Sequence, residues 1–219
     1  MLIVRQVKFN QCRHISAKEI LSRSNIRLGQ TLYSLDLPQI ATRIEQHPWV
    51  KHVTIRRTMW GLVELTITEW RPVAIWVGQT GSMAYVADDG TPFSKVDFSN
   101  QQGEFDLTMI TNVAEQPTVR RALQILKSLR GHPNFKDSLV GELYRSTDRI
   151  WAVQFQGESA RVVIDSTDVE RQLSRAFQVL LDLKRKMIVA RSIDCAFRDK
   201  VVVDVGFERK RGNSDDAKG

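Results

Sequence analysis

The first third of the chain shows a fixed order of hydrophobic periodicities, and this order constrains the fold more than any other feature. Val7 and Phe9 alternate with polar neighbours, as in a half-buried strand. Two helical segments follow, and then residues 53–57 and 63–68 alternate again across a turn at Gly61. The order β-α-α-β-β predicts a three-stranded sheet with both helices packed on one face.

Both helices of this first unit have recognisable start signals. Ser16 and Glu19 fit a capping box, in which the serine hydroxyl bonds a free backbone N–H and the glutamate reaches back. Asp36 and Pro38 supply an N-cap and a helix-compatible proline, and apolar residues at helical spacing continue until Pro48. We therefore expect two short helices between the first and second strands.

From residue 72 the pattern changes to that of a second, β-rich domain. Asp88-Asp89-Gly90 predicts a tight turn. One helix is expected from Pro117 to about Gly131, and a second is opened by a capping box at residues 167–170. The apolar stripe expected to face the core from this second helix is Val169, Leu173, Ala176, Phe177, Leu180 and Met187. Strands are expected at 74–77, 85–87, 140–144, 150–155 and 161–164.

A final hairpin is expected before a polar C-terminus. Ile193, Cys195 and Phe197 alternate in one strand, residues 198–200 turn, and residues 201–205 form the last strand. The fold class is therefore α+β: helices on a three-stranded sheet, then amphipathic helices packed on a mostly antiparallel sheet. The expected domains are 1–71 and 72–206, with a disordered polar tail at 207–219.

The chain has a net charge of +7, and most of it lies in the first unit. Residues 1–72 hold 11 Lys and Arg against 5 Asp and Glu. A nucleic-acid site would place such charges among stacking aromatics or along one helix, and neither arrangement occurs. We interpret the charge as a solvated basic face, suited to a position beside anionic lipid headgroups. A basic nucleic-acid-binding or extracytoplasmic module of unrelated role is the alternative.

Residue patterns that support catalysis or metal binding are missing from the sequence. Asp88 and Asp89 are adjacent carboxylates that suit a turn better than an acid/base pair. The four histidines form no i,i+4 pair. Cys12 and Cys195 have no metal or redox spacing and are expected to be small buried apolar residues. We expect a non-enzymatic protein with no cofactor and no metal.

No run of the sequence approaches the roughly 18 apolar residues of a membrane span, and no signal-peptide pattern occurs. The sequence is compatible with a membrane anchor or a signal peptide upstream of Met1.

Several phrases carry a family resemblance that covers nearly the whole chain. They are GQTL at 29–32, HPWVKHVTIRR at 47–57, VELTITEWRPVA at 63–74, VADDGTPF at 86–93, the helix at 171–181 and SID at 192–194. With its β-α-α-β-β order, the first unit resembles a POTRA domain, a module that contacts other polypeptides outside the cytoplasm. Together the phrases resemble the extracytoplasmic part of the FtsQ/DivIB family of bacterial cell-division proteins.

The resemblance implies a divisome scaffold that recruits other proteins at the septum, above all FtsB and FtsL. It also implies a single-pass protein of the bacterial inner membrane, with this part in the periplasm and a membrane helix that this chain does not contain. Other divisome proteins would bind the POTRA domain, and no nucleic acid is expected as a partner.

The resemblance further implies that FtsB pairs with the last strand. That role transfers to Val201, Val202, Val203, Asp204 and Val205. A free terminal strand can accept main-chain hydrogen bonds from a partner strand whatever the family. The competing interpretation is that these residues merely finish the sheet, with the edge shielded by neighbouring charges.

Two smaller sets of residues complete the expected binding sites. Arg149 resembles a family arginine that pairs with an acidic FtsB residue, although a solvated strand-end charge would look the same. Phe197 resembles a family aromatic. The arginine that precedes this aromatic in the family is absent here, and Arg198, the next residue, is the candidate to replace it. A second surface is expected on the POTRA domain at Val53, Arg56 and Arg57.

Overall fold

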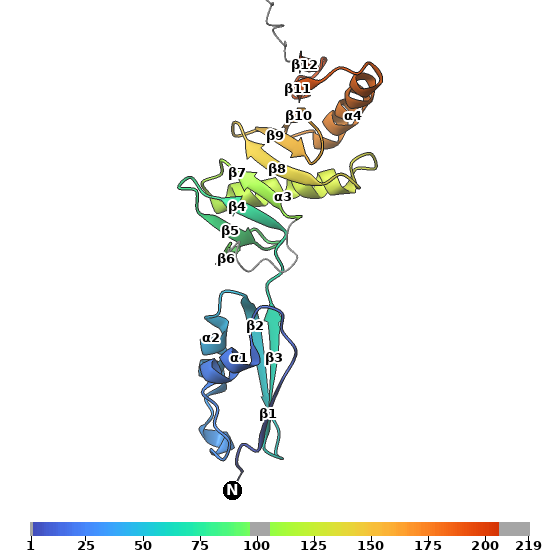
Figure 1. The fold of residues 1–219 in the computed structure, drawn as a ribbon. Coiled ribbons are helices and arrows are strands. Elements are labelled where there is room, and N and C mark those ends of the chain that lie inside the picture. The colour runs from blue at the N-terminus through green and yellow to red at the C-terminus, as the bar shows by residue number, and fades with distance from the viewer. Residues whose placement is uncertain (1, 97–105, 206–219) are drawn as a thin grey trace, which may run out of the picture. The chain divides into compact units, whose positions relative to one another are not determined.

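The computed structural model describes residues 2–96 and 106–205 (Figure 1). The chain divides into two compact units. The first unit runs to Ile75 and includes the hairpin of β5 (Met83–Val86) and β6 (Pro92–Lys95). The second unit contains Trp76–Gly81 and the elements from β7 (Thr108–Thr111) onward.

The first unit contains the predicted three-stranded sheet, in the order β1-β3-β2. Strand β1 (Gln6–Phe9) runs parallel to β3 (Leu62–Glu69). Strand β3 pairs antiparallel with β2 (Val50–Arg57). A parallel pair cannot be joined by a tight turn, so the two helices between β1 and β2 allow the chain to cross over. The β-α-α-β-β prediction is confirmed.

Both predicted helices of this unit form, and their caps are those expected from the sequence. In α1 (Ala17–Ser24), the Ser16 hydroxyl accepts from the Glu19 N–H, and the Glu19 carboxylate accepts from the Ser16 N–H at 2.9 Å. In α2 (Leu37–Glu45), the Asp36 carboxylate accepts from the Gln39 N–H. A short 3-10 helix, η1 (Leu32–Ser34), precedes α2.

The two helices cover one face of the three-stranded sheet (Figure 1). Ile20 of α1 and Ile40 and Ile44 of α2 are buried against the alternate apolar residues of the strands, which include Val63 and Leu65. Burial of this single face explains the strict alternation of β3 in the sequence.

The second sheet has nine strands in the order β12-β11-β10-β9-β8-β7-β4-β5-β6. Helix α3 (Gln116–Gly131) connects β7 to the parallel strand β8, and α4 (Val169–Arg185) connects β10 to the parallel strand β11. The pairs β8–β9, β9–β10, β11–β12 and β5–β6 are antiparallel. The remaining strands are β4 (Ala74–Val77), β8 (Val140–Arg145), β9 (Ile150–Phe155), β10 (Arg161–Asp165), β11 (Ala190–Asp194) and β12 (Val202–Val205).

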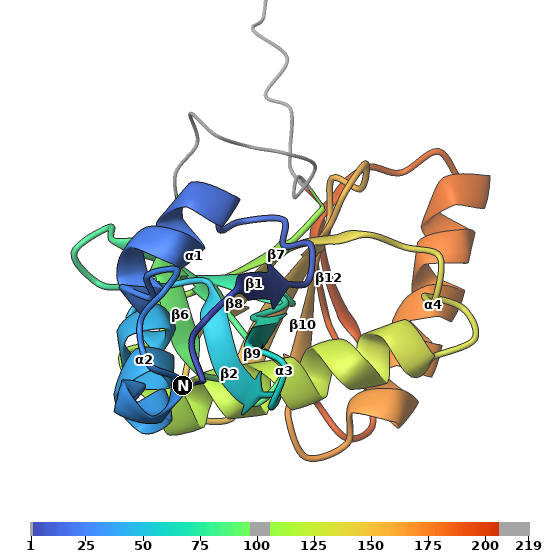
Figure 2. The same cartoon turned by 90° about the horizontal axis from the view of Figure 1, so that it is seen from below.

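Helices α3 and α4 lie next to each other beside the second sheet (Figure 2). Phe135, just after α3, stacks on Phe155 of β9 at a centroid distance of 4.9 Å and meets Phe177 of α4 edge-on at 5.8 Å. Trp151 of β9 is fully buried. This core holds α4 against β10 and β11, and so positions the C-terminal hairpin.

Two predictions for α4 were wrong. The capping box at residues 167–170 does not form, because the Thr167 hydroxyl donates to the Asp165 carboxylate at 2.8 Å and the N-cap, Asp168, makes no side-chain cap bond. Met187 does not belong to the buried stripe. The helix ends at Arg185, so Met187 lies beyond it. Its φ of 53° is left-handed and not helical, and its side chain is exposed.

The predicted domain boundary at residue 71 stays a prediction. The first sheet ends at Glu69 and β4 begins at Ala74, but the β5–β6 hairpin groups with the first unit although it belongs to the second sheet. The predicted polar tail at 207–219 lies outside the described residues.

Candidate functional site

Strand β12 lies at one end of the nine-stranded sheet, and among residues 2–96 and 106–205 it pairs on one side only, with β11. The register places Val203 opposite Ile193 and Val202 opposite Asp194. Val202 and Val205 are 44% and 39% exposed, which is unusual for valines in a strand of a packed sheet. Within the described part of the chain, the outer side of β12 therefore presents main-chain groups and apolar side chains without a covering element.

The turn between β11 and β12 begins earlier than the sequence pattern predicted. Strand β11 ends at Asp194, because the Asp194 carboxylate accepts from the Ala196 N–H at 2.9 Å and bends the chain. Phe197 was expected within the strand but lies in the turn, where its side chain is 46% exposed. Arg198 lies in the same turn, so the alternation of side chains along an extended strand does not apply to this pair.

Arg175 of α4 holds this turn in place. Its guanidinium donates to the carbonyl oxygens of Phe197 at 2.8 Å and Arg198 at 3.2 Å, and also to the carbonyl of Lys200. A planar group with several fixed N–H donors can bind three carbonyls at once, which a lysine cannot do in the same geometry. Arg175 was not predicted from the sequence, because its position on the polar face of α4 gives no signal of a contact made 22 residues later in the chain.

A basic groove lies between the start of α4 and this turn, with a volume of about 370 Å³. It brings together three predicted partner-binding residues, Arg149, Phe197 and Arg198. The groove carries four arginines against two aspartates, so its net charge is positive. The residues that line it are Arg149, Asp165, Thr167, Asp168, Arg171, Gln172, Arg175, Ala196, Phe197 and Arg198.

Arg149 is paired within the groove, because its guanidinium donates to the Asp165 carboxylate at 2.8 Å. Burial alone would raise the pKa of Asp165, but hydrogen bonds from Thr167 and Arg149 outweigh it and lower this pKa below its ordinary value. Asp165 is therefore ionised at neutral pH. Asp165 neutralises part of the charge of the Arg149 guanidinium. A partner carboxylate that approached Arg149 would therefore share this guanidinium with Asp165.

The residues of the second predicted surface belong to the first unit, whereas β12 belongs to the second unit. Val53 is buried in the core of that unit, and its N–H donates to the Glu45 carboxylate at 2.9 Å. Residues of one strand alternate between core and solvent, and Val53 faces the core. Its side chain therefore does not contribute to the predicted surface. Arg56 and Arg57 are exposed.

The two cysteines differ in exposure. Cys195, directly after β11, is fully buried, and burial raises the pKa of its thiol to about 11. Cys12 is only partly buried, and burial together with the charge of Glu69 raises the pKa of its thiol above the ordinary value. Because the thiolate is the reactive form, neither cysteine is activated as a nucleophile. The prediction of a buried apolar residue is confirmed for Cys195 and only partly met by Cys12.

Comparison with known proteins gives consistent matches. Residues 2–70 match the family model of the POTRA domain, FtsQ-type. The cell division protein FtsQ of Geotalea daltonii is 24% identical over 212 residues, which cover 91% of this chain and 74% of that protein. The cell division protein FtsQ of Syntrophotalea carbinolica is 25% identical over 223 residues, which cover 95% of this chain and 76% of that protein.

Among solved structures, the major extracytoplasmic domain of the division protein DivIB from Geobacillus stearothermophilus aligns with 14% identity and a TM-score of 0.35. The alignment covers 52% of this chain and 96% of that domain. Among the helices in the described part of this chain, none combines the length and apolar composition that a membrane span requires.

Proposed function

Because the chain belongs to the FtsQ/DivIB family of bacterial cell-division proteins, we propose that it is a non-enzymatic divisome scaffold that binds a partner strand along β12. The partners are FtsB, which docks on β12, and FtsL with it. Other division proteins bind the first unit. The protein is anchored in the inner membrane by a helix outside this chain and carries these two units in the periplasm.

The observation that carries the proposal is the edge of β12, Val202–Val205, which no other strand covers in the part of the chain that the structure describes. A partner strand that pairs there gains main-chain hydrogen bonds, and the exposed valines add apolar contact on alternate faces. The clamp by Arg175 fixes the turn before the strand, so less conformational freedom is lost when the partner binds.

The basic groove supports the same proposal, because it lies at the start of the same hairpin. Phe197 and Arg198 line the groove and immediately precede the residues that lead into β12. An acidic segment at one end of the partner would be attracted by the excess of arginines, while the strand beside it pairs with the edge. The groove then determines orientation and the rate of encounter, and the edge provides most of the affinity.

Reversal of one groove charge tests this division of roles. In a titration with the C-terminal segment of the same organism's FtsB, Arg198→Glu should lower the affinity about tenfold, mostly through slower association. The side chain of Arg198 makes no hydrogen bond or ion pair within the described residues, so the fold should be unaffected. Lys127→Glu is the matched control, because Lys127 is an exposed cation of α3 outside the groove.

A salt series separates this proposal from nucleic-acid binding. Strand pairing should survive 0.5 M salt with a moderate loss, whereas affinity for a polyanion should fall by orders of magnitude. Equal affinities of the Arg198→Glu and Lys127→Glu variants for FtsB would remove the groove from the site and leave only the edge.

A further inference from the structure

The first unit carries an exposed apolar and basic surface at the end of its sheet where β2 turns into β3. Three segments meet there: residues 2–5, 27–33 and 57–61, which we call the tip surface. The Val4 N–H donates to the Gln30 carbonyl at 2.8 Å, and the Arg5 N–H donates to the Gly61 carbonyl at 2.8 Å. The guanidinium of Arg57 donates to the Leu32 carbonyl at 3.0 Å. The segments therefore form one connected surface.

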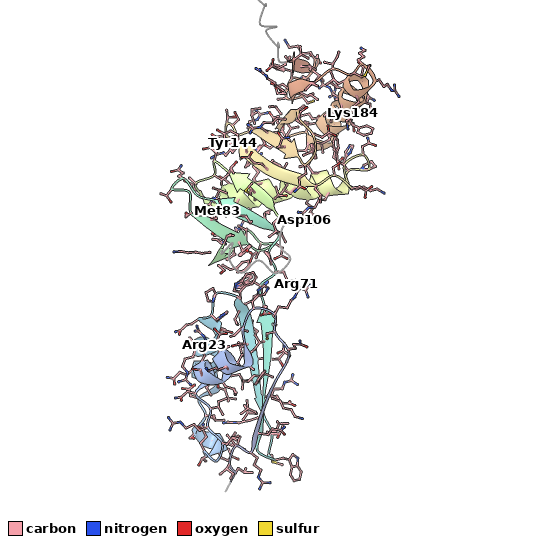
Figure 3. All side chains as sticks on the ribbon, viewed as in Figure 1. Arg23, Arg71, Met83, Asp106, Tyr144 and Lys184 are labelled. Atoms are coloured by element: carbon pink, nitrogen blue, oxygen red, sulfur yellow. The ribbon has the colours of Figure 1, made fainter. Side chains whose placement is uncertain are left out.

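Four large apolar side chains of the tip surface are left in solvent. Trp60 is 83% exposed, Met59 77%, Tyr33 73% and Leu28 70%. Single exposed apolar residues are ordinary, but four on two adjoining segments, 27–33 and 57–61, indicate a binding surface. These four side chains come from turns and a short 3-10 helix and not from one flat strand or helix face, so each projects outward separately. Figure 3 shows side chains extending outward from this end of the sheet.

The charges of the tip surface have one sign. Arg5, Arg27 and Arg57 are all exposed, and the three segments contain no Asp or Glu. Arg57 lies 5.6 Å from the ring of Tyr33, which keeps a cation beside an aromatic side chain. Nothing in the proposed docking at β12 uses these residues, because they belong to the other unit.

We propose that the tip surface binds an anionic phospholipid bilayer, with Trp60, Met59, Tyr33 and Leu28 at the level of the lipid headgroups and the arginines on the phosphates. Tryptophan and tyrosine favour this interface because each has an apolar ring and a polar edge. Arginines above it are attracted by the negative surface potential.

Other occupants fit the same features less well. Two copies of the chain that met through this surface would place the arginines of one copy against those of the other. Single-stranded nucleic acid would gain stacking from Trp60 and Tyr33, but Leu28 and Met59 offer no stacking face. A lipid surface accommodates scattered projecting side chains because its headgroups rearrange around them.

Vesicle flotation tests the proposal with the complete chain. The protein should float with vesicles of phosphatidylcholine and phosphatidylglycerol, and little should float with pure phosphatidylcholine. The double variant Met59→Ser/Trp60→Ser should partition about tenfold less, and Arg27→Gln about fivefold less. Raised salt should weaken the binding.

The matched control is Met187→Ser/Val189→Ser, which removes two similarly exposed apolar side chains from the second unit and should leave flotation unchanged. All variants should melt like the wild type and bind FtsB equally, so a failure here is independent of the docking at β12. The proposal is overturned if the wild-type protein does not float with anionic vesicles, or if the tip and control variants float equally.

Discussion

Proline at one of two consecutive positions in β12, Val202 or Val203, is expected to weaken partner binding at least roughly tenfold without unfolding the protein. In an antiparallel pair, successive residues of an edge strand direct their N–H groups alternately toward the neighbouring strand and toward the free edge. Proline removes the N–H, so the variant at the outward-facing position loses a donor that only the partner uses. The affinity for the FtsB segment should fall at least roughly tenfold, because a hydrogen bond is lost and the ring obstructs the incoming strand.

The other proline variant provides the internal comparison. At the inward-facing position, proline breaks a bond of the β11–β12 ladder and should lower the melting temperature. Alanine at each position keeps the N–H and should cause only a small loss of affinity. The docking model is contradicted if both proline variants melt like the wild type and bind the FtsB segment with unchanged affinity.

Alanine at Gly61 is expected to destabilise the first unit strongly. Gly61 has a φ of 84°, and a Cβ atom at this position would lie 2.5 Å from the carbonyl oxygen of Ile3. The backbone cannot simply move away, because the Gly61 carbonyl accepts from the N–H groups of Arg5 and Gln6. We expect a loss of about 3 kcal/mol in the free energy of unfolding, from conformational strain and the steric clash together.

Gly29 is the matched control for this prediction. It has the same φ of 84°, but a Cβ atom there would meet nothing within 4 Å. Gly29→Ala should therefore lose only the conformational part, about 1 kcal/mol. Urea unfolding of both variants measures the difference. Equal losses would show that the close approach between Ile3 and the β2–β3 turn relaxes without cost.

The fold was predictable where local signals and tertiary packing agree. The caps of α1 and α2 follow from residues three apart, Ser16 with Glu19 and Asp36 with Gln39, and both form. The alternation of β3 predicts its buried face, since one side packs against the helices and the other does not. Gly90, with a φ of 84°, fits the turn predicted before β6.

The errors arise where a nearby polar side chain competes with the pattern read from the sequence. Thr167 looked like a cap, but the carboxylate of Asp165 takes its hydroxyl. Phe197 continued an apolar alternation, but Asp194 ends the strand first. Both hydrogen bonds join residues two apart, and hydrophobic periodicity does not reveal them because it records only which positions are apolar.

The strand of the candidate site was predictable from the sequence, whereas the groove beside it was predictable only in part. A final strand after the last helix is expected at a sheet edge, and β12 lies there. Arg149, Phe197 and Arg198 were named separately, yet they line one groove. Arg175, which holds the turn, was missed because its three acceptors are main-chain carbonyls, and these carry no side-chain signal in the sequence.

Amide hydrogen exchange of residues 202–205, with and without a saturating FtsB segment, tests the central claim most directly. Pairing at the free edge predicts that alternate amides of β12, those directed away from β11, exchange at least roughly tenfold more slowly in the complex. Amides of α3 should be unchanged. Slower exchange elsewhere in the protein, with β12 unaffected, would contradict docking by strand addition.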